Sequence, residues 1–411
     1  MTFQCRFCGA KVSHVVADLG SSPLSNSYLS AEQLQQAEAT FPLCAYLCEE
    51  CLLVQLPELQ SPEAIFDDAY AYFSSYSDSW LDHARRYVEM MCDRFGFSGR
   101  HQVVEIASND GYLLRFFKDR GVPVLGIEPA ANVAAAAAEL GIESRVEFFG
   151  VESARTLAAE GRRANLLLGN NVLAHTPRLN DFVAGLQIAL ADQGIITMEF
   201  PHLVRLIAEN QFDTIYHEHF SYFSFLAVDR IFESHELCIF DVEELPTHGG
   251  SLRIFARHAA DRSHEVTRRV EGLRQREREL GLDRPAYYLA FAEQVRETKR
   301  KLLEFLIDAK RQGRSIVGYG APAKGNTLLN YCGIGTDFLD YTVDRSPHKQ
   351  GRFLPGSRIP IYAPDRIRET RPDDVLILPW NLQREIMEQM ADVREWGGRF
   401  IMAIPEVTII D

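Results

Sequence analysis

Short apolar runs alternate with helical patterns through the middle of the chain. The apolar runs that predict strands are residues 103–107, 124–127, 165–168 and 194–200. The segments that predict helices are residues 113–120, 130–140 and 179–190. Because strands that alternate with helices are typical of a parallel sheet covered by helices, this region predicts a central Rossmann-like α/β domain.

A second alternation of the same kind follows a charged stretch. Residues 263–312 mix arginines with glutamates at helical spacing, which favours solvated helices over a nucleic-acid-binding patch. Further strands are predicted at residues 315–319, 341–344, 375–378 and 400–404. We therefore expect three parts: an N-terminal module (1–66), the central domain (67–250), and a helical connector with a C-terminal Rossmann-like αβ domain (251–411).

Composition and charge limit the classes of function. The 411 residues are 46% hydrophobic and 24% charged, as in ordinary globular proteins. The net charge of 43 − 57 = −14 argues against a general nucleic-acid binder. No apolar run approaches the ~20 residues of a membrane-spanning helix, and residues 1–8 lack an apolar stretch after a basic start. We expect a cytoplasmic monomer with no membrane or nucleic-acid partner.

Four of the eight cysteines form two Cys-x-x-Cys pairs near the N-terminus. They are Cys5, Cys8, Cys48 and Cys51. Structural zinc prefers four soft ligands in a tetrahedron, which these thiolates supply, and Gly9 permits the first tight turn. Without a nearby set of histidines or carboxylates to hold an open coordination position, the pattern predicts structural rather than catalytic zinc. The alternative, free or redox-active pairs, would place Cys-x-x-Cys at the start of a helix after a strand, which neither pair fits.

A polar loop follows the first strand of the central domain, at the sheet edge where doubly wound folds bind ligands. Of the dinucleotide-binding pattern Gly-x-Gly-x-x-Gly it keeps only Gly111, so NAD is not expected. The pattern Glu105-x-Ala107-x-Asn109-x-Gly111 resembles a variant of the S-adenosylmethionine methyltransferase loop, Glu/Asp-x-Gly-x-Gly-x-Gly, from which Ala107 and Asn109 depart.

Residues farther along the central domain support this cofactor. Glu128 ends the next strand, where an acid can accept hydrogen bonds from both ribose hydroxyls. Phe148 or Phe149 would cover the adenine, and Asn170 and Asn171 follow a strand where the methionine part would lie. An exposed loop acid and core phenylalanines are the alternatives for single members of this set. The ordered set as a whole predicts S-adenosylmethionine.

Residues 212–224 form the densest polar and aromatic cluster of the chain. It contains residue types used in acid–base catalysis: Tyr216, His217, Glu218, His219 and Tyr222. Histidine titrates near neutrality and is the commonest general base, and tyrosines can donate to a developing enolate oxygen. Because adjacent residues cannot all face one pocket, we expect only one of the two histidines to be catalytic; a metal pair and a structural role stay open. His175 should face the same crevice.

A glycine-containing loop, residues 318–326, opens a helix in the C-terminal domain. Its amides and Lys324, with Gly320 and Asn326 beside them, would suit an anion such as a diphosphate. The loop lacks the full Walker pattern, so nucleotide hydrolysis is not expected. A packing turn is the alternative.

Together these residues resemble the sugar C-methyltransferases that act on nucleotide-linked deoxyhexoses in antibiotic sugar pathways. The shared motifs cover nearly the whole chain, in the order of the family: the two Cys-x-x-Cys pairs, then residues 72–78, 105–111, 171–177, 216–222, 248–253 and 318–326. The resemblance implies an N-terminal zinc-binding module, a central S-adenosylmethionine domain and a C-terminal Rossmann-like domain.

The resemblance also implies a substrate and a mechanism. The substrate would be a nucleoside-diphosphate 4-keto-deoxyhexose, methylated at carbon 3. The base of the family is the last histidine of the Tyr-His-Glu-His motif, a role that falls on His219. The residues implied around the sugar are Tyr76, His175, Tyr216, Glu218 and Tyr222. His219 would remove the proton next to the keto group, and carbon 3 would then attack the sulfonium methyl group.

Three alternatives stay open at this point. One is methylation at carbon 5 or on oxygen of a nucleotide sugar. Another is a non-catalytic, zinc-containing binding protein with a methyltransferase fold, which would leave the His-Glu-His cluster without a role. The last is a Rossmann-type oxidoreductase that uses the C-terminal domain, which needs a stronger dinucleotide fingerprint than Gly318-x-Gly320.

Overall fold

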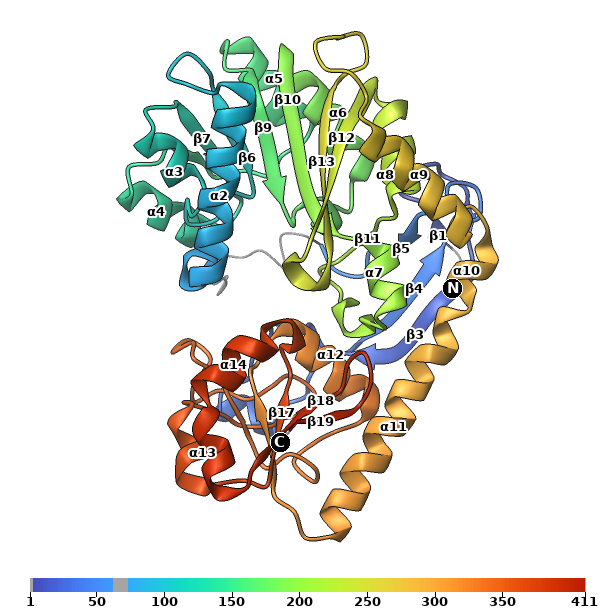
Figure 1. The fold of residues 1–411 in the computed structure, drawn as a ribbon, viewed down its shortest axis with the longest axis vertical. Helices are drawn as coiled ribbons and strands as arrows, with labels where there is room; N and C mark the ends of the chain where they lie inside the picture. The colour runs from blue at the N-terminus through green and yellow to red at the C-terminus, as the bar shows by residue number, and fades with distance from the viewer. Residues whose placement is uncertain (1–2, 62–72, 411) are drawn as a thin grey trace.

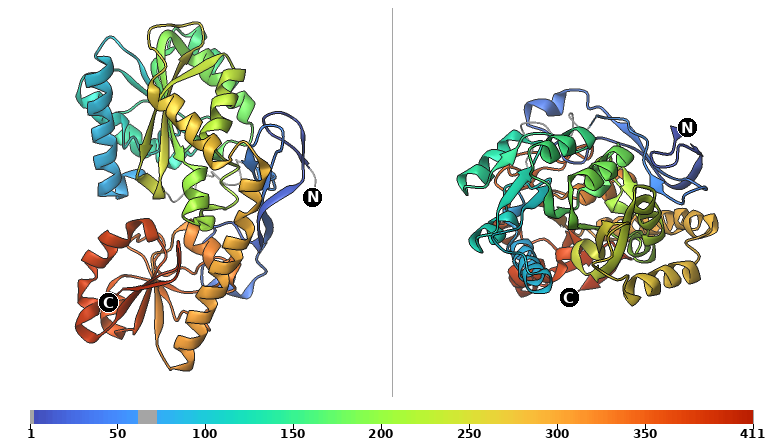
Figure 2. Two further views of the ribbon diagram at one scale, coloured as in Figure 1. Left: turned by 45° about the vertical axis from the view of Figure 1, so that its right-hand side comes forward. Right: turned by 90° about the horizontal axis from the view of Figure 1, so that it is seen from above.

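The computed structural model describes residues 3–61 and 73–410. The central and C-terminal domains form two lobes, and the N-terminal module lies along one side together with the long helix α11 (Phe291–Arg311) (Figures 1 and 2). Residues 67–95 are rich in aromatic side chains, and Tyr70 or Tyr72 of this segment could take the place of Tyr76 beside the sugar; both lie outside the described residues. Within those residues, no helix combines the length and the apolar character that crossing a membrane requires.

The N-terminal module consists of short antiparallel strands. A two-stranded sheet pairs β1 (Phe3–Gln4) with β2 (Lys11–Val12). A four-stranded sheet has the order β11-β5-β4-β3, formed by β3 (His14–Ser22), β4 (Phe41–Leu47), β5 (Val54–Gln55) and β11 (Ser221–Tyr222). Because β11 directly follows the Tyr-His-Glu-His motif, the module's sheet anchors the motif of the central domain.

The central domain is built on a seven-stranded sheet of order β12-β13-β10-β9-β6-β7-β8. Its strands are β6 (Val103–Ile106), β7 (Val124–Ile127), β8 (Ser144–Arg145), β9 (Ala164–Asn170), β10 (Leu190–Pro201), β12 (Leu237–Leu245) and β13 (Ser251–His258). The helices that cover it include α2 (Asp78–Phe95), α3 (Leu114–Asp119), α4 (Ala131–Glu139), α5 (Val151–Ala159), α6 (Leu179–Ala189) and α8 (Phe225–Ser234). Helix α7 (Leu203–Ala208) packs instead with residues of the N-terminal module and the C-terminal domain.

The predicted Rossmann-like sheet is confirmed, and burial on both faces explains its apolar strands. In β9, Leu166 and Leu168 pack in the cluster that includes residues of α2 and α3, whereas Leu167 packs in the cluster on the opposite face. Successive side chains of a strand point to opposite faces, so a strand covered on both sides needs a continuous apolar run.

The central sheet extends beyond the expected boundary at residue 250. That residue lies between β12 and β13, which pair antiparallel, and β13 also pairs with β10. The central sheet therefore continues to His258. This hairpin escaped the sequence analysis because charged residues interrupt its apolar pattern, and Asp241 pairs with Arg94 and Arg269 inside the fold.

The C-terminal domain is a second α/β unit, as expected. Helices α9 (Arg268–Leu280), α10 (Pro285–Leu289) and α11 connect it to the central domain. Its sheet has the order β16-β15-β14-β17-β18-β19, with strands β14 (Ile316–Tyr319), β15 (Thr342–Val343), β16 (Ile361–Tyr362), β17 (Asp374–Ile377), β18 (Arg399–Met402) and β19 (Thr408–Ile410). Its helices are α12 (Ala323–Cys332), α13 (Asp365–Thr370) and α14 (Gln383–Gln389).

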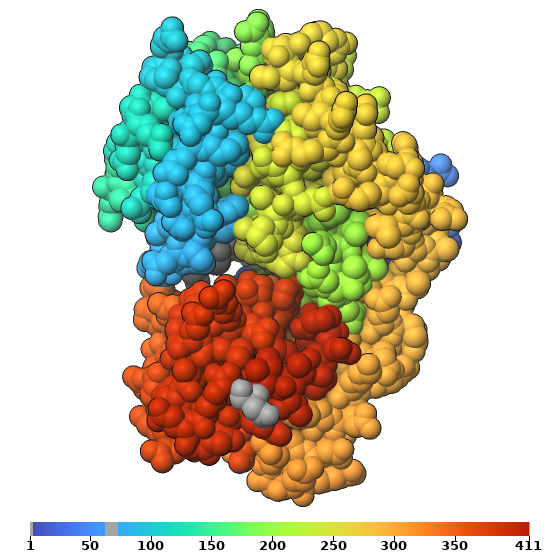
Figure 3. All heavy atoms as spheres, viewed as in Figure 1, coloured from blue at the N-terminus to red at the C-terminus, as the bar shows by residue number. Residues whose placement is uncertain are grey.

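The two lobes meet along a common interface. In the space-filling view, the lower end of α2 faces the C-terminal domain across a narrow gap (Figure 3). Helix α11 contacts both β3 of the N-terminal module and α12 of the C-terminal domain. All three parts of the chain therefore meet at the carboxyl ends of the central strands.

Candidate functional site

The two Cys-x-x-Cys pairs converge on one point of the N-terminal module. The four Sγ atoms of Cys5, Cys8, Cys48 and Cys51 all lie within 4.8 Å of one another, and the Cys5–Cys51 and Cys8–Cys48 pairs are each 3.5 Å apart. A Zn–S bond of about 2.3 Å in a tetrahedron places sulfurs about 3.8 Å apart. Gln55 Nε2 lies 3.1 Å from Cys5 Sγ and can donate to it, as expected of a group that supports a thiolate ligand. This arrangement fits zinc.

The residue that follows each Cys-x-x-Cys pair has a left-handed backbone conformation. Gly9 has φ 74°, and its amide donates to the Cys5 carbonyl at 3.0 Å. Leu52 has φ 62°, and its amide donates to the Cys48 carbonyl at 2.8 Å. A leucine with positive φ is strained, so the second turn is held by the structure around it.

One cavity of about 540 Å³ lies between the three parts of the chain. The N-terminal module contributes Asn26, the central domain forms most of the wall, and the C-terminal domain contributes Pro322, Ala323, Lys324 and Lys349. A cavity of this size is typical of small-molecule sites. Its wall includes residues expected for the cofactor and residues expected for catalysis.

Glu128 forms the cofactor end of the cavity with the loop after β6. Its carboxylate accepts hydrogen bonds from the backbone amides of Asn109 (3.0 Å) and Ala130 (2.9 Å), and burial raises its pKa. Ala107 and Asn109 also line the cavity, with φ values of 55° and 50°. Asn170 lines it too and donates to the Tyr112 hydroxyl at 3.1 Å. The carboxylate of Glu128 has further acceptor positions that fit the ribose hydroxyls of S-adenosylmethionine. The side-chain amides of Asn170 and Asn171 fit its amino-acid part.

The remaining predicted cofactor residues fall into two groups. Phe148, Phe149 and Asn171 line the cavity. Glu105 and Gly111 are not among the described residues that line it. Glu105 is fully buried, and burial raises its pKa well above the ordinary value. Gly111 has φ 76°, and a Cβ there would lie 2.5 Å from Ile142 Cδ1. Glu105 and Gly111 therefore support the conformation of the loop without lining the cavity.

His219 lines the same cavity in a defined tautomer. Its Nδ1 is 3.0 Å from the Thr214 carbonyl oxygen and therefore donates to it. Its Nε2 is 2.8 Å from the Tyr216 hydroxyl, which donates to the free lone pair of this nitrogen. Burial, followed by the positive charge of His175 when that ring is protonated, lowers the pKa of His219 well below its usual value. The neutral ring is thus poised to accept a proton at Nε2.

The neighbouring histidine of the motif points elsewhere. His217 Nε2 lies 3.2 Å from the Pro42 carbonyl oxygen, and its ring meets Phe41 of β4 edge-on at 6.0 Å. Among the described residues, the cluster of ligand-type side chains suited to a metal is the four cysteines, not a set with His217 or His219. Of the two histidines, His219 is therefore the one that faces the cavity.

Other predicted catalytic residues surround His219. The His175 ring lies 4.6 Å from that of His219, and burial lowers its pKa to about 4. Glu218 lines the cavity and accepts a hydrogen bond from Asn26 Nδ2 at 2.7 Å; burial raises its pKa to about 7. Tyr222 is buried, with its ring 6.2 Å from that of His219. His175 and Glu218 line the cavity, whereas Tyr222 is not among the described residues that line it.

Tyr76 lies apart from this cluster. Its side chain is 62% exposed, and its ring stacks on Phe73 at 5.4 Å and on His348 of the C-terminal domain at 6.3 Å. It is not among the described residues that line the cavity.

The C-terminal loop supplies one of its three expected residues to the cavity. Lys324 lines it and donates to Asn381 Oδ1 at 2.8 Å, with Nζ 4.2 Å from the Trp380 ring centre. Burial lowers the pKa of Lys324 to about 8. Gly320 packs instead against Pro379, and Asn326 Nδ2 donates to the Ser25 carbonyl at 2.6 Å. These two residues hold the loop against its surroundings.

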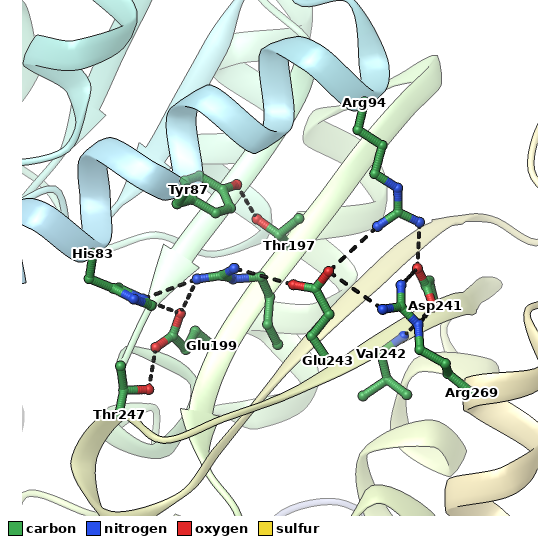
Figure 4. A network of polar contacts seen from close by, with 11 residues as sticks. His83, Tyr87, Arg94, Thr197, Glu199, Asp241, Val242, Glu243, Thr247 and Arg269 are labelled. Atoms are coloured by element: carbon green, nitrogen blue, oxygen red, sulfur yellow. Dashed lines mark hydrogen bonds and ion pairs between the residues drawn. The ribbon is translucent and has the colours of Figure 1, made fainter.

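A buried polar network supports the wall of the cavity (Figure 4). Glu199, near the end of β10, pairs with Arg253 of β13 at 2.7 Å and with His83 of α2 at 2.9 Å, and it accepts from Thr247 Oγ1 at 2.8 Å. Burial raises the pKa of Glu199, but the His83 hydrogen bond and the Arg253 charge outweigh it and lower the pKa to about 2. The network therefore carries a fixed carboxylate at neutral pH.

Sequence reasoning assigned no role to several residues that line the cavity. They are Asn26, Trp80, His248 and Lys349. Asn26 lies 192 positions from its partner Glu218, and no local pattern marks such a contact. His248 lies in residues 248–253, one of the motifs shared with the sugar C-methyltransferases, and that motif could have indicated a functional role.

Comparison with known proteins finds three families along the chain. Three family models match: a zinc binding domain over residues 5–66, a methyltransferase domain over 65–239 and a C-methyltransferase C-terminal domain over 246–405. The curated C-methyltransferase NovU of Streptomyces niveus is 37% identical over 407 residues, which covers 99% of this chain and 96% of that protein.

Solved structures of methyltransferases cover about half of this chain. A methyltransferase from Anabaena variabilis, described as SAM-dependent, is 17% identical and covers 50% of this chain and 99% of its own, with a TM-score of 0.37. The magnesium protoporphyrin IX methyltransferase of Synechocystis, solved with SAM bound, is 12% identical and covers 47% of this chain and 88% of its own, with a TM-score of 0.35.

Proposed function

Because the chain belongs to the zinc-containing, S-adenosylmethionine-dependent C-methyltransferases, we propose that it methylates carbon 3 of a nucleoside-diphosphate 4-keto-deoxyhexose. One observation carries the proposal: Glu128, His219 and Lys324 all line a single cavity. A methyl donor and a nucleotide sugar would therefore meet in one enclosed space, as group transfer requires.

S-adenosylmethionine supplies an electrophilic methyl group when it is bound. We assign the ribose hydroxyls to the carboxylate of Glu128, whose position is fixed by two backbone amides. Asn170 and Asn171 face the methionine part, and Phe148 or Phe149 covers the adenine. Ala107 and Asn109 bring the loop backbone against the cofactor, while Glu105 and Gly111 maintain the shape of that loop.

Proton removal is assigned to His219, acting through Tyr216. Since the Tyr216 hydroxyl donates to His219 Nε2, the proton of carbon 3 passes to the tyrosine oxygen as the hydroxyl proton moves to Nε2. The electron pair of the broken C–H bond forms the carbon–carbon double bond of an enolate, and the π pair of the carbonyl group moves onto the keto oxygen. Carbon 3 of the enolate would then take the methyl group, whose bond to the sulfonium sulfur breaks and leaves S-adenosylhomocysteine. The Thr214 carbonyl, which accepts from Nδ1, stabilises the protonated ring.

The substrate end of the cavity suits an anion beside a sugar. Lys324 opens α12 and Lys349 lies near it, so these two cations would hold the diphosphate. The positive charge of Lys324 helps to lower the pKa of His219. The negative charge of a bound diphosphate would offset that positive charge. Substrate binding would therefore raise the basicity of His219. Glu218, His175, Tyr222 and Tyr76 are assigned to the sugar.

A methyl-transfer assay tests the proposal. The protein is incubated with S-adenosylmethionine that carries a ¹³C-methyl group and with a panel of nucleoside-diphosphate 4-keto-deoxyhexoses. The matched control sugars carry a 4-hydroxyl group in place of the ketone, because they lack the acidic proton. We expect labelled methyl on carbon 3 of a keto sugar and none on the controls. Methyl on oxygen or on carbon 5, or methylation of the hydroxy sugars, would overturn the assignment.

A further inference from the structure

A third histidine, His248, lines the cavity together with His175 and His219. It belongs to the short turn Thr247–Gly249 that joins β12 to β13, and its side chain lines the cavity. On the cofactor side, its ring meets Trp80 at 5.0 Å, and its Nε2 is 2.9 Å from Asn171 Nδ2. His248 therefore contacts two residues of the part of the wall assigned to the cofactor and shares the cavity with His219 and Lys324.

The hydrogen bond to Asn171 defines the state of the His248 ring. Because the Asn171 amide nitrogen is a donor, Nε2 of His248 accepts, and the proton of the neutral ring lies on Nδ1. Burial, with help from the positive charge of Lys324, lowers the pKa of His248 to about 4. The ring is neutral at physiological pH and retains one N–H donor for a ligand in the cavity. A neutral imidazole of this kind can polarise a carbonyl group without giving up its proton.

The backbone around His248 is held in an unfavourable conformation. His248 has φ 54°, a left-handed value that a non-glycine residue adopts at an energetic cost. The preceding Thr247 is tied to the buried Glu199, which Arg253 and His83 fix in turn (Figure 4). The following Gly249 packs so closely on Trp380 that a Cβ would lie 2.3 Å from that ring. The turn thus presents the imidazole from a rigid support, as preorganised stabilisation requires.

We propose that His248 is a further catalytic residue, whose Nδ1–H donates a hydrogen bond to the keto oxygen of the substrate as the enolate forms. The inference rests on the proposed function. The base and this donor then act on neighbouring atoms: the C–H bond at carbon 3 breaks, its proton goes to the Tyr216–His219 pair, and the electron pair becomes the carbon–carbon double bond of an enolate. The charge develops on the oxygen that His248 contacts, and His248 keeps its proton throughout.

Hydrogen exchange without methyl transfer tests this role, with two matched variants. Both His248→Gly and His248→Asn tolerate a left-handed backbone, so neither strains the turn, but only asparagine offers an N–H donor. Each protein is incubated in D₂O with the 4-keto sugar and S-adenosylhomocysteine, and the signal of the hydrogen on carbon 3 is followed by NMR. Loss of one such donor costs about 100-fold in rate. We therefore expect His248→Gly to exchange the hydrogen on carbon 3 about 100-fold more slowly than the unmodified protein. His248→Asn should exchange it at least about tenfold faster than His248→Gly.

Binding of S-adenosylhomocysteine, measured by titration calorimetry, separates this role from a structural one. We expect the affinity of both variants to stay close to that of the unmodified protein. Exchange by His248→Gly at the unmodified rate overturns the proposal. A fall in exchange that is matched by an equal fall in affinity also overturns it, because the histidine would then serve the cofactor site. Absence of exchange in the unmodified protein with every keto sugar would instead count against the proposed function.

Discussion

The two Rossmann-like domains are alike around their first two strands and differ in what lies beyond them. In the central domain, Glu128 follows β7 and accepts from the backbone amide of Asn109, in the loop after β6. In the C-terminal domain, Asp344 follows β15 and accepts from the backbone amide of Ala321 at 2.8 Å, in the loop after β14. In both domains, an acid after the second strand holds the loop that follows the first.

Beyond this shared element the two sites diverge. Glu128 lines the cavity, whereas Asp344 is not among the described residues that line it. In the C-terminal domain, the Tyr28 hydroxyl and Lys349 Nζ both donate to the Ala321 carbonyl, at 2.6 and 2.9 Å. Side chains of the protein therefore occupy the space next to that loop. The C-terminal domain contributes two cations to the cavity, Lys324 and Lys349, which we call the cationic wall. The same topology therefore carries the proposed cofactor site in one domain and the cationic wall in the other, so the function depends on the residues placed on the fold.

Loss of zinc should have the largest effect, because the N-terminal module contacts both domains. Structural zinc contributes about 10–16 kcal/mol to small zinc modules, so Cys48→Ser should unfold the module, displace Asn26 and β11, and abolish methyl transfer. Binding of S-adenosylhomocysteine, whose end of the cavity belongs to the central domain, should largely persist in calorimetry. The control is Cys92→Ser, a half-buried thiol of α2. Methylation at the unmodified rate by Cys48→Ser would contradict this account.

The paired acids allow the comparison itself to be tested. Glu128→Gln removes a charged acceptor of the ribose hydroxyls, and charged hydrogen bonds contribute about 1.5–3 kcal/mol each, so the affinity for S-adenosylhomocysteine should fall about 100-fold. Asp344→Asn lies outside the cavity and should change that affinity by no more than about twofold. Calorimetric titration of both variants measures the difference. Equal losses would mean that the C-terminal domain also holds the cofactor.

The cationic wall should affect the sugar rather than the cofactor. Lys324→Met should raise the KM for the nucleotide sugar about 10-fold to 30-fold, the range for one charged hydrogen bond, with unchanged affinity for S-adenosylhomocysteine. Because burial lowers the pKa of Lys324 to about 8, the ammonium group loses its proton as the pH rises through that value. The kcat/KM of the unmodified protein should therefore fall above pH 8, and that fall should be absent in Lys324→Met.

Lys310→Met, on α11, is the control for this substitution, since Lys310 pairs with Asp340 outside the cavity. An unchanged KM in Lys324→Met would remove the diphosphate from this part of the wall.

The smallest effect is expected at the contact between the module and the motif. Asn26→Ala removes the donor to Glu218 and leaves a buried carboxyl group unsatisfied, which should lower kcat about tenfold. Asn180→Ala is a matched control, because Asn180 also links the central domain to the module, by donating to the Phe7 carbonyl at 2.8 Å. Equal effects of the two substitutions would show that Asn26 only joins the two parts.

Local signals predicted the fold and the motif residues. Continuous apolar runs such as that of β9 marked the buried strands, and the residues at the ends of strands, such as Glu128, lie at the sheet edge as expected. Cysteine spacing alone predicted the zinc cluster. The β12–β13 hairpin was missed because its charged residues are neutralised by distant arginines, which no local pattern reveals.

Contacts between distant segments limited the prediction of the site. The role of Asn26 depends on its contact with Glu218, which is far away in the chain. The role of His248 depends on a turn that Glu199 holds through Thr247. Gly320 and Asn326 were expected beside an anion because they flank Lys324, yet packing directs them to Pro379 and Ser25. Assignment of Tyr76 to the sugar stays a prediction.

Deprotonation by His219 is the central claim, and exchange at carbon 3 in D₂O tests it most directly. With the 4-keto sugar and S-adenosylhomocysteine, the unmodified protein should replace the hydrogen on carbon 3 by deuterium. Removal of a general base costs about 10²–10⁴-fold, so His219→Asn should exchange at least about 100-fold more slowly while it binds S-adenosylhomocysteine as before. Exchange by His219→Asn at the unmodified rate would contradict the account.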